Sequence, residues 1–315
     1  MGGIKALEKI SVAECVPKRK IRWKPVSWLC LALVFTPIIA YFLFNGFPVV
    51  LSFISMFTDM QANDITTMEW NGFDNFRQVF TDPKFWGSWK STLILATSQI
   101  ITLLISLVIA VLLEQKVKGA KILQIIFFIP YICSGVAVAI MWMWVFNKDL
   151  GILNSILGQN IDWLNDSDRP MRLIVCVYVT IVWQAPAYGI VMFKAALKNV
   201  NPALYEAASL DGANAFYKFW HITLPGIKSV LLFLLLASVT QGLAVFDSVL
   251  VLAPLDWKQT AGPDNVGLTV NYYIYMQGVY NDEMEYAAVM SWFLFAVTFL
   301  ISFPIIRARN KASEG

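Results

Sequence analysis

The chain has 315 residues, of which 58% are hydrophobic and only 14% are charged, and its formal net charge is +3. Soluble domains typically hold about 45–50% apolar and about 25% charged residues, so the composition excludes an ordinary soluble domain. The apolar residues are gathered in long charge-free blocks, which are typical of helices that cross a lipid bilayer. The composition therefore predicts an all-α integral membrane protein.

Residues 1–27 form a basic segment before the first apolar block. The run KRKIRWK at 18–24 lies directly beside that block, close to Trp28. Clustered lysine and arginine next to a membrane helix favour an anchor on anionic lipid, and we prefer this interpretation to a nucleic-acid patch. We therefore expect the lipid bilayer as a partner and no nucleic acid. The block itself is too long for the core of a cleavable signal peptide.

Six segments are long and apolar enough to span the membrane. They are residues 28–57, 91–113, 122–147, 173–193, 229–255 and 286–306, and Asp247 is the single charged residue among them. If the six segments cross the membrane in turn, residues 1–27, 114–121, 194–228 and 307–315 lie on one side of it. They hold 17 lysines and arginines, against 7 in the loops on the other side. Short cytoplasmic loops carry the excess of positive charge, so both termini are expected in the cytoplasm. The predicted domains are a cytoplasmic segment 1–27, a six-helix transmembrane domain 28–306 and a cytoplasmic tail 307–315.

The outer loop between the first two spans holds Phe73, Phe76 and Phe80 at helical spacing. This pattern predicts a short amphipathic helix on the outer surface.

Polar and aromatic side chains inside the fourth and fifth spans are candidates for a solute pathway. The candidates are Trp183, Gln184, Tyr188, Ser238, Gln241 and Asp247. Pro186 lies among the first three, and its missing N–H favours a kink. Sugar rings present apolar faces and hydroxyl edges, which suit aromatic rings beside amide and hydroxyl groups. Packing between helices is the alternative role for each of these residues.

The cytoplasmic loop 201–228 is unusually polar for this chain. Asn201 and Pro202 predict a helix start, and Gly212 predicts a left-handed turn. A second short helix is expected to end at Pro225 and Gly226. Its aromatic residues, beside Glu206, Asp211 and Lys218, form either a protein docking surface or a helix lying on lipid; we prefer the first. The aromatic residues are Phe216, Tyr217, Phe219 and Trp220.

Several kinds of chemistry have no motif in this sequence. The dipeptide Gly-Lys never occurs, which excludes a Walker A phosphate loop. His221 is the one histidine, and the four cysteines lack metal-binding spacing, so no metal site and no cofactor are expected. Asp247 is the one charge within the spans, which argues against an ion-coupled carrier. Energy for uphill transport would therefore come from another protein.

Residues 206–225 fill every fixed position of the pattern E-A-A-x3-G-x9-I-x-L-P. These positions are Glu206, Ala207, Ala208, Gly212, Ile222, Leu224 and Pro225. The pattern resembles the EAA loop of permeases in bacterial ABC importers. Further stretches, such as 127–154 and 260–275, resemble the carbohydrate-uptake branch and the first of its two unlike permease subunits. The resemblance implies a type I ABC importer permease fold with cytoplasmic coupling helices between spans four and five.

The resemblance also implies a set of partners. Glu206 and Asp211 would meet basic groups of a cytoplasmic ATPase, Gly212 would form the turn, and Phe216 would fill the ATPase cleft. The ATPase, a homodimer or heterodimer, would carry ATP and Mg, while this subunit would carry no cofactor and would not be an enzyme. The other implied partners are a second homologous permease, an extracytoplasmic solute-binding protein and a sugar. The implied location is a bacterial or archaeal cell membrane.

In maltose-type permeases the sugar site uses positions that match both Gln241 and Gly242, where this chain departs from the maltose pattern. The other matching positions are Gln184, Tyr188, Ser238 and Val245. We therefore expect an oligosaccharide other than maltose. The alternatives are a permease for glycerol phosphate or another polar solute in the same ABC machinery, and an ion-coupled carrier.

Overall fold

The computed structural model describes residues 25–59, 65–114, 119–256 and 260–314. The basic run at 18–24 and most of the predicted segment 1–27 lie outside these ranges. Helices make up 78% of the residues that the structure describes. The chain divides into two compact units, Met1–Leu51 and Ser52–Gly315, and each is described by itself.

The first unit is built from one apolar helical stretch. Helix α1 covers Pro25–Tyr41, a π-helical turn η1 covers Phe42–Gly46, and α2 covers Phe47–Ser55 and ends in the second unit. Large side chains such as Phe35 and Phe44 are exposed along it. Exposed apolar surface of this extent requires lipid or another protein as its neighbour. The first span predicted from the sequence, at 28–57, therefore matches a candidate span at Trp28–Ser55.

The second unit begins with a small cap. Strand β1 (Thr58–Asp59) pairs antiparallel with β2 (Glu69–Trp70), with a 3-10 turn at Ile65–Thr67 between them. Helix α3 follows at Asp74–Thr81, which confirms the predicted amphipathic helix. The amide of Asn75 donates to the carbonyl oxygens of Met56 and Thr58, at 3.2 and 2.8 Å, and so fixes α3 against β1.

The helices from α4 to α9 include the longest one and two breaks. Helix α4 spans Pro83–Glu114. Helices α5 (Ala120–Ile132) and α6 (Gly135–Val145) meet at an angle of 101°, so the segment 122–147, expected as one span, is sharply bent. Pro130 lacks an N–H and Cys133 is extended (ψ 147°), which ends α5 there. Helix α7 covers Ile152–Leu157, while α8 (Met171–Gln184) and α9 (Pro186–Lys198) join at Ala185.

The remaining elements follow in chain order. They are α10 (Pro202–Leu210), α11 (Ala215–Lys218), η4 (Phe219–Thr223), α12 (Leu224–Gly226), α13 (Lys228–Leu243), α14 (Asp247–Leu252), η5 (Pro263–Asn265), α15 (Val270–Tyr275), η6 (Met276–Tyr280) and α16 (Met284–Glu314). Within the described ranges, five helical stretches are long and apolar enough to span a membrane, or six if α5 and α6 form one broken span.

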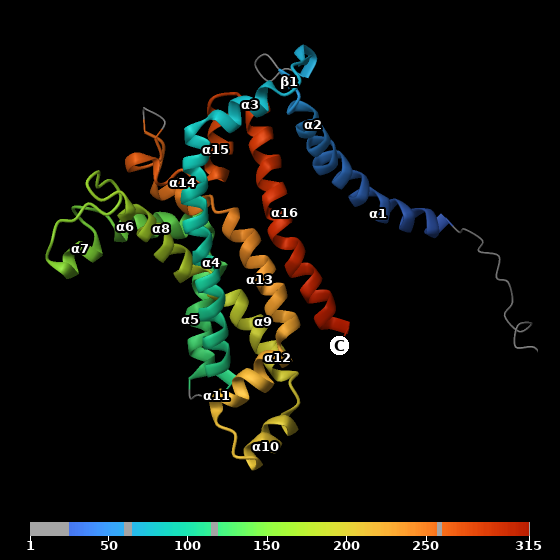
Figure 1. Ribbon diagram of the computed structural model, residues 1–315, viewed down its shortest axis with the longest axis vertical. Coiled ribbons are helices and arrows are strands. Elements are labelled where there is room, and N and C mark those ends of the chain that lie inside the picture. The colour runs from blue at the N-terminus through green and yellow to red at the C-terminus, as the bar shows by residue number, and fades with distance from the viewer. Residues whose placement is uncertain (1–24, 60–64, 115–118, 257–259, 315) are drawn as a thin grey trace, which may run out of the picture. The chain divides into compact units, whose positions relative to one another are not determined.

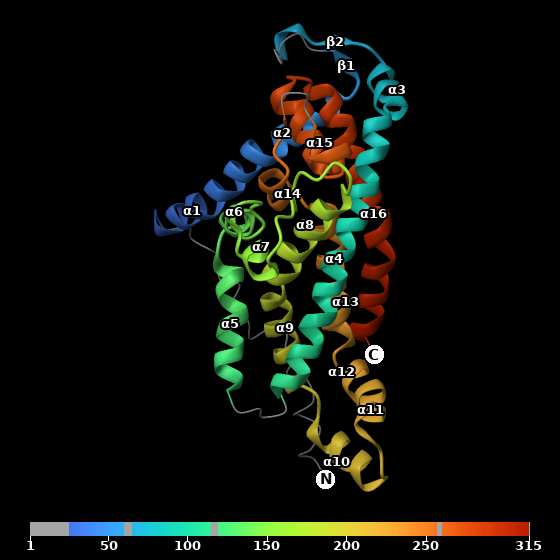
Figure 2. The ribbon, with the colours of Figure 1, turned by 90° about the vertical axis from the view of Figure 1, so that its left-hand side faces the viewer.

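Helix α4 is the centre of the second unit. It packs against α9, α13 and α8, and α13 packs in turn against α16 (Figures 1 and 2). One buried cluster, which includes Phe85, Leu173 and Tyr272, joins α4 to α8, α14, α15 and α16. A second cluster, which includes Leu107 and Phe193, joins α4 to α9 and α13. Polar residues in the middle of α4 lie between these two clusters, where the structure is hollow.

Candidate functional site

Two adjoining cavities lie between α4, α5, the α8–α9 junction and α13. The smaller has a volume of about 70 Å³ and the larger, which extends toward α14, about 340 Å³. Four residues line both of them, namely Gln99, Tyr131, Ala185 and Gln241. We call the two together the central cavities. They bring groups from α4, α5, α6, α8, α9, α13 and α14 to one place among the candidate spans.

Five of the six predicted pathway residues line the central cavities. They are Gln184, Tyr188, Ser238, Gln241 and Asp247. The Gln184 amide donates to the carbonyl oxygen of Cys133 at 3.3 Å, which ties α8 to the bend between α5 and α6. The sixth, Trp183, is not among the lining residues. Its ring packs edge-on against Trp142 with 5.7 Å between centroids, because neighbouring residues of a helix point about 100° apart.

Helices α4 and α5 supply further lining residues, which were not predicted from the sequence. Gln99, Thr102 and Ser106 come from α4, and Tyr131 comes from α5. The ring of Tyr131 is stacked with Tyr188 at 6.4 Å and 18°. Gln99, Thr102 and Ser106 could have been found from the sequence, because they recur at spacings of three and four in an otherwise apolar span and so form a polar stripe on one helical face. Nothing in the local sequence indicates that the side chain of Tyr131 points into the cavities.

Ser106 also explains how α9 starts beside α4. Its hydroxyl lies 2.9 Å from the carbonyl oxygen of Pro186 and 2.7 Å from that of Thr102, in its own helix. A Cβ added at Gly189 would lie only 2.7 Å from Ser106, so this glycine permits the close approach of the two helices. The junction of α8 and α9 at Ala185 is thus held by a buried contact between α9 and α4.

Asp247 is the single charged residue among the described residues that line the central cavities. It begins α14 and lies against the start of α6, where a Cβ added at Gly135 would be 3.1 Å from its Oδ2 atom. Its side chain forms no hydrogen bond or ion pair with the residues that the structure describes. The other polar lining groups are uncharged amides and hydroxyls, so the cavities suit a polar, hydrogen-bonding solute.

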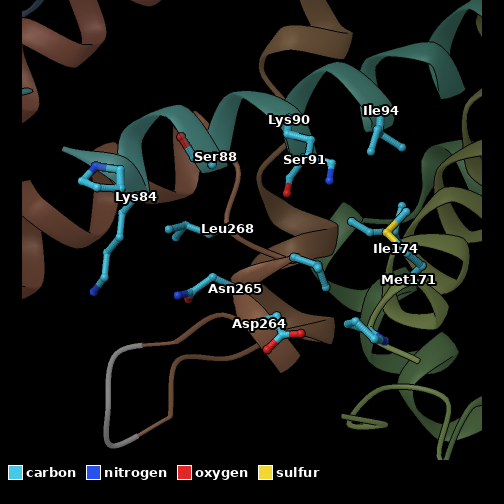
Figure 3. Close-up of a pocket in the computed structure, with 14 residues that line it drawn as sticks. Lys84, Ser88, Lys90, Ser91, Ile94, Met171, Ile174, Asp264, Asn265 and Leu268 are labelled. Atoms are coloured by element: carbon cyan, nitrogen blue, oxygen red, sulfur yellow. The ribbon is translucent and has the colours of Figure 1, made fainter. Parts of the chain in front are cut away.

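A third cavity of about 510 Å³ lies at the N-terminal end of α4, between that helix, the start of α8 and the loop before α15 (Figure 3). Lys84 and Lys90 stand on the α4 side, and Asp264 stands on the loop side. The backbones of Asp264 and Asn265 are left-handed, with φ of 51° and 57°. We call this the rim cavity. It could not be predicted from the sequence, because its three walls are far apart in the chain.

The loop 201–228 forms the predicted helix, turn and helix. The side chain of Asn201 accepts from Ala203 N–H at 3.0 Å and caps α10. Gly212 takes a left-handed φ of 76°. Asn214 then caps the second helix by accepting from Tyr217 N–H at 2.8 Å. That helix continues through the π-helical turn η4 and ends at Gly226.

The two halves of this loop are joined to each other but are open to their surroundings. The hydroxyl groups of Tyr205 and Thr223 lie 2.9 Å apart, and Lys218 donates to Ser209 at 2.7 Å. The predicted coupling residues are all exposed; these are Glu206, Ala207, Asp211, Gly212, Phe216 and Pro225. Leu210 is 90% exposed and Phe216 is 73% exposed. We call this exposed helix–turn–helix the elbow.

The elbow carries more apolar surface than a solvated loop needs. Tyr217 and Trp220 are also exposed, and His221 is stacked on Tyr217 with centroids 4.0 Å apart. A hollow of about 370 Å³ lies at the turn beside Asp211 and Asn214. Apolar side chains rimmed by charges are typical of a surface that another protein covers.

Comparison with known proteins identifies the kind of molecule. Residues 102–311 match the family model described as "Binding-protein-dependent transport system inner membrane component". The chain is 31% identical over 281 residues to the probable ABC transporter permease protein YesP of Bacillus subtilis, with 87% of each chain covered. It is 29% identical to the lactose transport system permease LacF of Rhizobium radiobacter, covering 75% of this chain and 80% of that one.

A permease named for arabinooligosaccharides, AraP of Halalkalibacterium halodurans, is 28% identical over 284 residues, covering 88% of this chain and 86% of that one. The fold is shared with a bacterial ABC transporter of known structure that imports the acidic polysaccharide alginate. That match has a TM-score of 0.73 at 24% identity and covers 92% of this chain and 96% of the other. At this level of identity, the likeness concerns the fold.

Proposed function

The chain belongs to the family of binding-protein-dependent transport system inner membrane components, and from this premise we propose that it forms half of the pathway of an ATP-driven oligosaccharide importer. It is a permease subunit of a sugar importer, like the relatives that are named for lactose and for arabinooligosaccharides. A second, homologous permease would form the other half. The central cavities are the observation that carries this proposal, because they gather uncharged hydrogen-bonding groups and stacked tyrosines in the middle of the spans.

The solute we propose is an oligosaccharide that slides along these groups. Gln99, Gln184 and Gln241 supply amides, and Tyr131 with Tyr188 supplies an aromatic wall. One relative is named for sn-glycerol-3-phosphate, which supports the same machinery with another solute. A phosphate is usually bound by arginine or lysine. Neither occurs among the described lining residues of the central cavities, so we favour the sugar.

Energy would reach the pathway through the elbow. We propose that α10 and α11 dock into a cytoplasmic ATPase, on which ATP and Mg are bound. Leu210 and Phe216 would be buried in that contact, and Glu206 and Asp211 would set its register through basic groups. Closure of the ATPase dimer would move α10 to α12, and α13 would carry the movement to Ser238 and Gln241, which lie in the same helix.

The orientation follows from charge. With 17 lysines and arginines on the side of the elbow and both termini, and 7 on the other, we assign the elbow to the cytoplasm. The C-terminal end of α16 lies toward the same end of the second unit as α10 (Figure 2). The rim cavity then faces the extracytoplasmic side, where we propose that a solute-binding protein docks. The location we propose is a bacterial or archaeal cell membrane.

The test is reconstitution with matched variants. The tagged permease is purified from its native membranes with the proteins that accompany it, and its ATPase activity in proteoliposomes is measured with a panel of sugars. We expect one sugar to stimulate hydrolysis in the presence of the binding protein. Tyr188→Ala should abolish that stimulation, whereas Val175→Ala, exposed on α8 away from the central cavities, should preserve it. Equal stimulation in both variants would refute the pathway.

A further inference from the structure

The charge in the central cavities is distributed very unevenly. The smaller cavity has no charged side chain among its described lining residues, and the larger has one, Asp247. The larger cavity lies toward α14, the end that we assign to the extracytoplasmic side. A solute entering from outside therefore passes a carboxylate before it reaches Ser238 and Tyr188.

The carboxylate of Asp247 is placed so that its charge acts on the cavity. It has no ion pair with any residue that the structure describes. The start of α6 lies against it, since a Cβ added at Gly135 would be 3.1 Å from its Oδ2 atom. Asp247 is itself exposed to that cavity, and a charge beside protein walls acts more strongly than one in open water.

We propose that Asp247 is an electrostatic filter, which makes the pathway selective for uncharged oligosaccharides and unfavourable to solutes carrying carboxylates or phosphates. The inference rests on the proposed function, since it concerns what passes through the same cavities. The proposed filter predicts that this chain differs in its solute from the alginate importer that shares its fold, because alginate is an acidic polysaccharide. It also argues independently against glycerol phosphate.

The filter can be measured without knowing the sugar. The native cysteines at positions 15, 30 and 133 are replaced by serine and buried Cys176 by alanine, and Gln241→Cys supplies one thiol in the cavities. Its labelling rate is measured in native membranes with a cationic reagent, trimethylammonium-ethyl methanethiosulfonate, and with an anionic one, sulfonatoethyl methanethiosulfonate. The ratio of the two rates reports the local field, because comparison between variants cancels intrinsic reactivity.

Asp247→Asn should lower the cation-to-anion ratio at position 241 by roughly three- to tenfold, mainly by accelerating the anionic reagent. Asp149→Asn, which removes an exposed charge outside the cavities, should leave it unchanged. Ser238→Cys, which lies only in the smaller cavity, should report a smaller effect than Gln241→Cys.

Two outcomes would overturn the filter, and they differ in what else they overturn. If both reagents react but Asp247→Asn changes the ratio by less than twofold, the filter is wrong and the water-accessible pathway remains. If neither reagent reacts at position 241 or 238, the cavities are closed to solutes, and the filter and the proposed pathway both fail.

Discussion

Substitution of Gly212 tests how much the left-handed turn of the elbow contributes to binding of the ATPase. Its φ of 76° is left-handed, and a Cβ added there would meet nothing within 4 Å. The whole cost of a side chain is therefore backbone strain, about 1–2 kcal/mol for alanine and less for asparagine. Because the turn is exposed, this strain should hardly change the stability of the chain. If the ATPase binds only the turned form, the strain should weaken its binding by roughly 5- to 30-fold.

The assay is the affinity of the purified ATPase for the permease in nanodiscs. The expected order is glycine, asparagine, alanine and valine, from tightest to weakest. Gly158→Ala is the matched control, because Gly158 also has a left-handed φ, of 63°, and open space around its Cα. It ends α7, far along the chain from the elbow. Equal affinity for Gly212 and Gly212→Ala, or a loss of affinity in Gly158→Ala, would refute the reasoning.

Three further predictions follow from the same geometry. Phe216→Ala should lower ATPase affinity by roughly 30-fold or more while leaving the melting temperature unchanged, since this ring is 73% exposed; a calorimetric titration and a melting curve check both. Lys84→Glu with Lys90→Glu should raise the concentration of binding protein needed for half-maximal ATPase stimulation by about tenfold, and less at high salt, where charges are screened; an effect independent of salt would contradict docking at the rim cavity. Ser106→Ala removes a hydroxyl that lies 2.9 Å from Pro186 O and should lower the free energy of unfolding by about 1 kcal/mol, measured by titration with denaturing detergent; an unchanged value would show that this contact is dispensable.

The parts of the fold that could be predicted from the sequence are those with local causes. Asn201 and Asn214 cap their helices through side chains only two or three residues away, and Gly212 turns because glycine tolerates a positive φ. The span lengths likewise follow from runs of apolar residues. The bend between α5 and α6 did not follow, because Pro130 alone is compatible with a straight membrane helix. Its angle of 101° depends on how α6 packs against α14 and α8.

The residues of the candidate site likewise divide into those that a local sequence pattern predicts and those that depend on packing between helices. Gln184 and Tyr188 could be found because they lie four apart beside Pro186 on one helical face. Trp183, adjacent in sequence, faces Trp142 instead, and no local pattern distinguishes the two faces of such an apolar helix. Tyr131 lines the central cavities only because α5 packs beside α9. The direction of a side chain in a membrane bundle is set by its neighbours, which single-sequence reasoning does not contain.

The most direct test of the account is the accessibility of one thiol at the elbow. With the four native cysteines replaced as above, Leu210→Cys is introduced where the side chain is 90% exposed, and labelling by a membrane-impermeant maleimide is compared between right-side-out and inside-out vesicles. We expect labelling only in inside-out vesicles stripped of the ATPase, and protection of the thiol when the ATPase is added back. Labelling in right-side-out vesicles, or no protection by the ATPase, would contradict it.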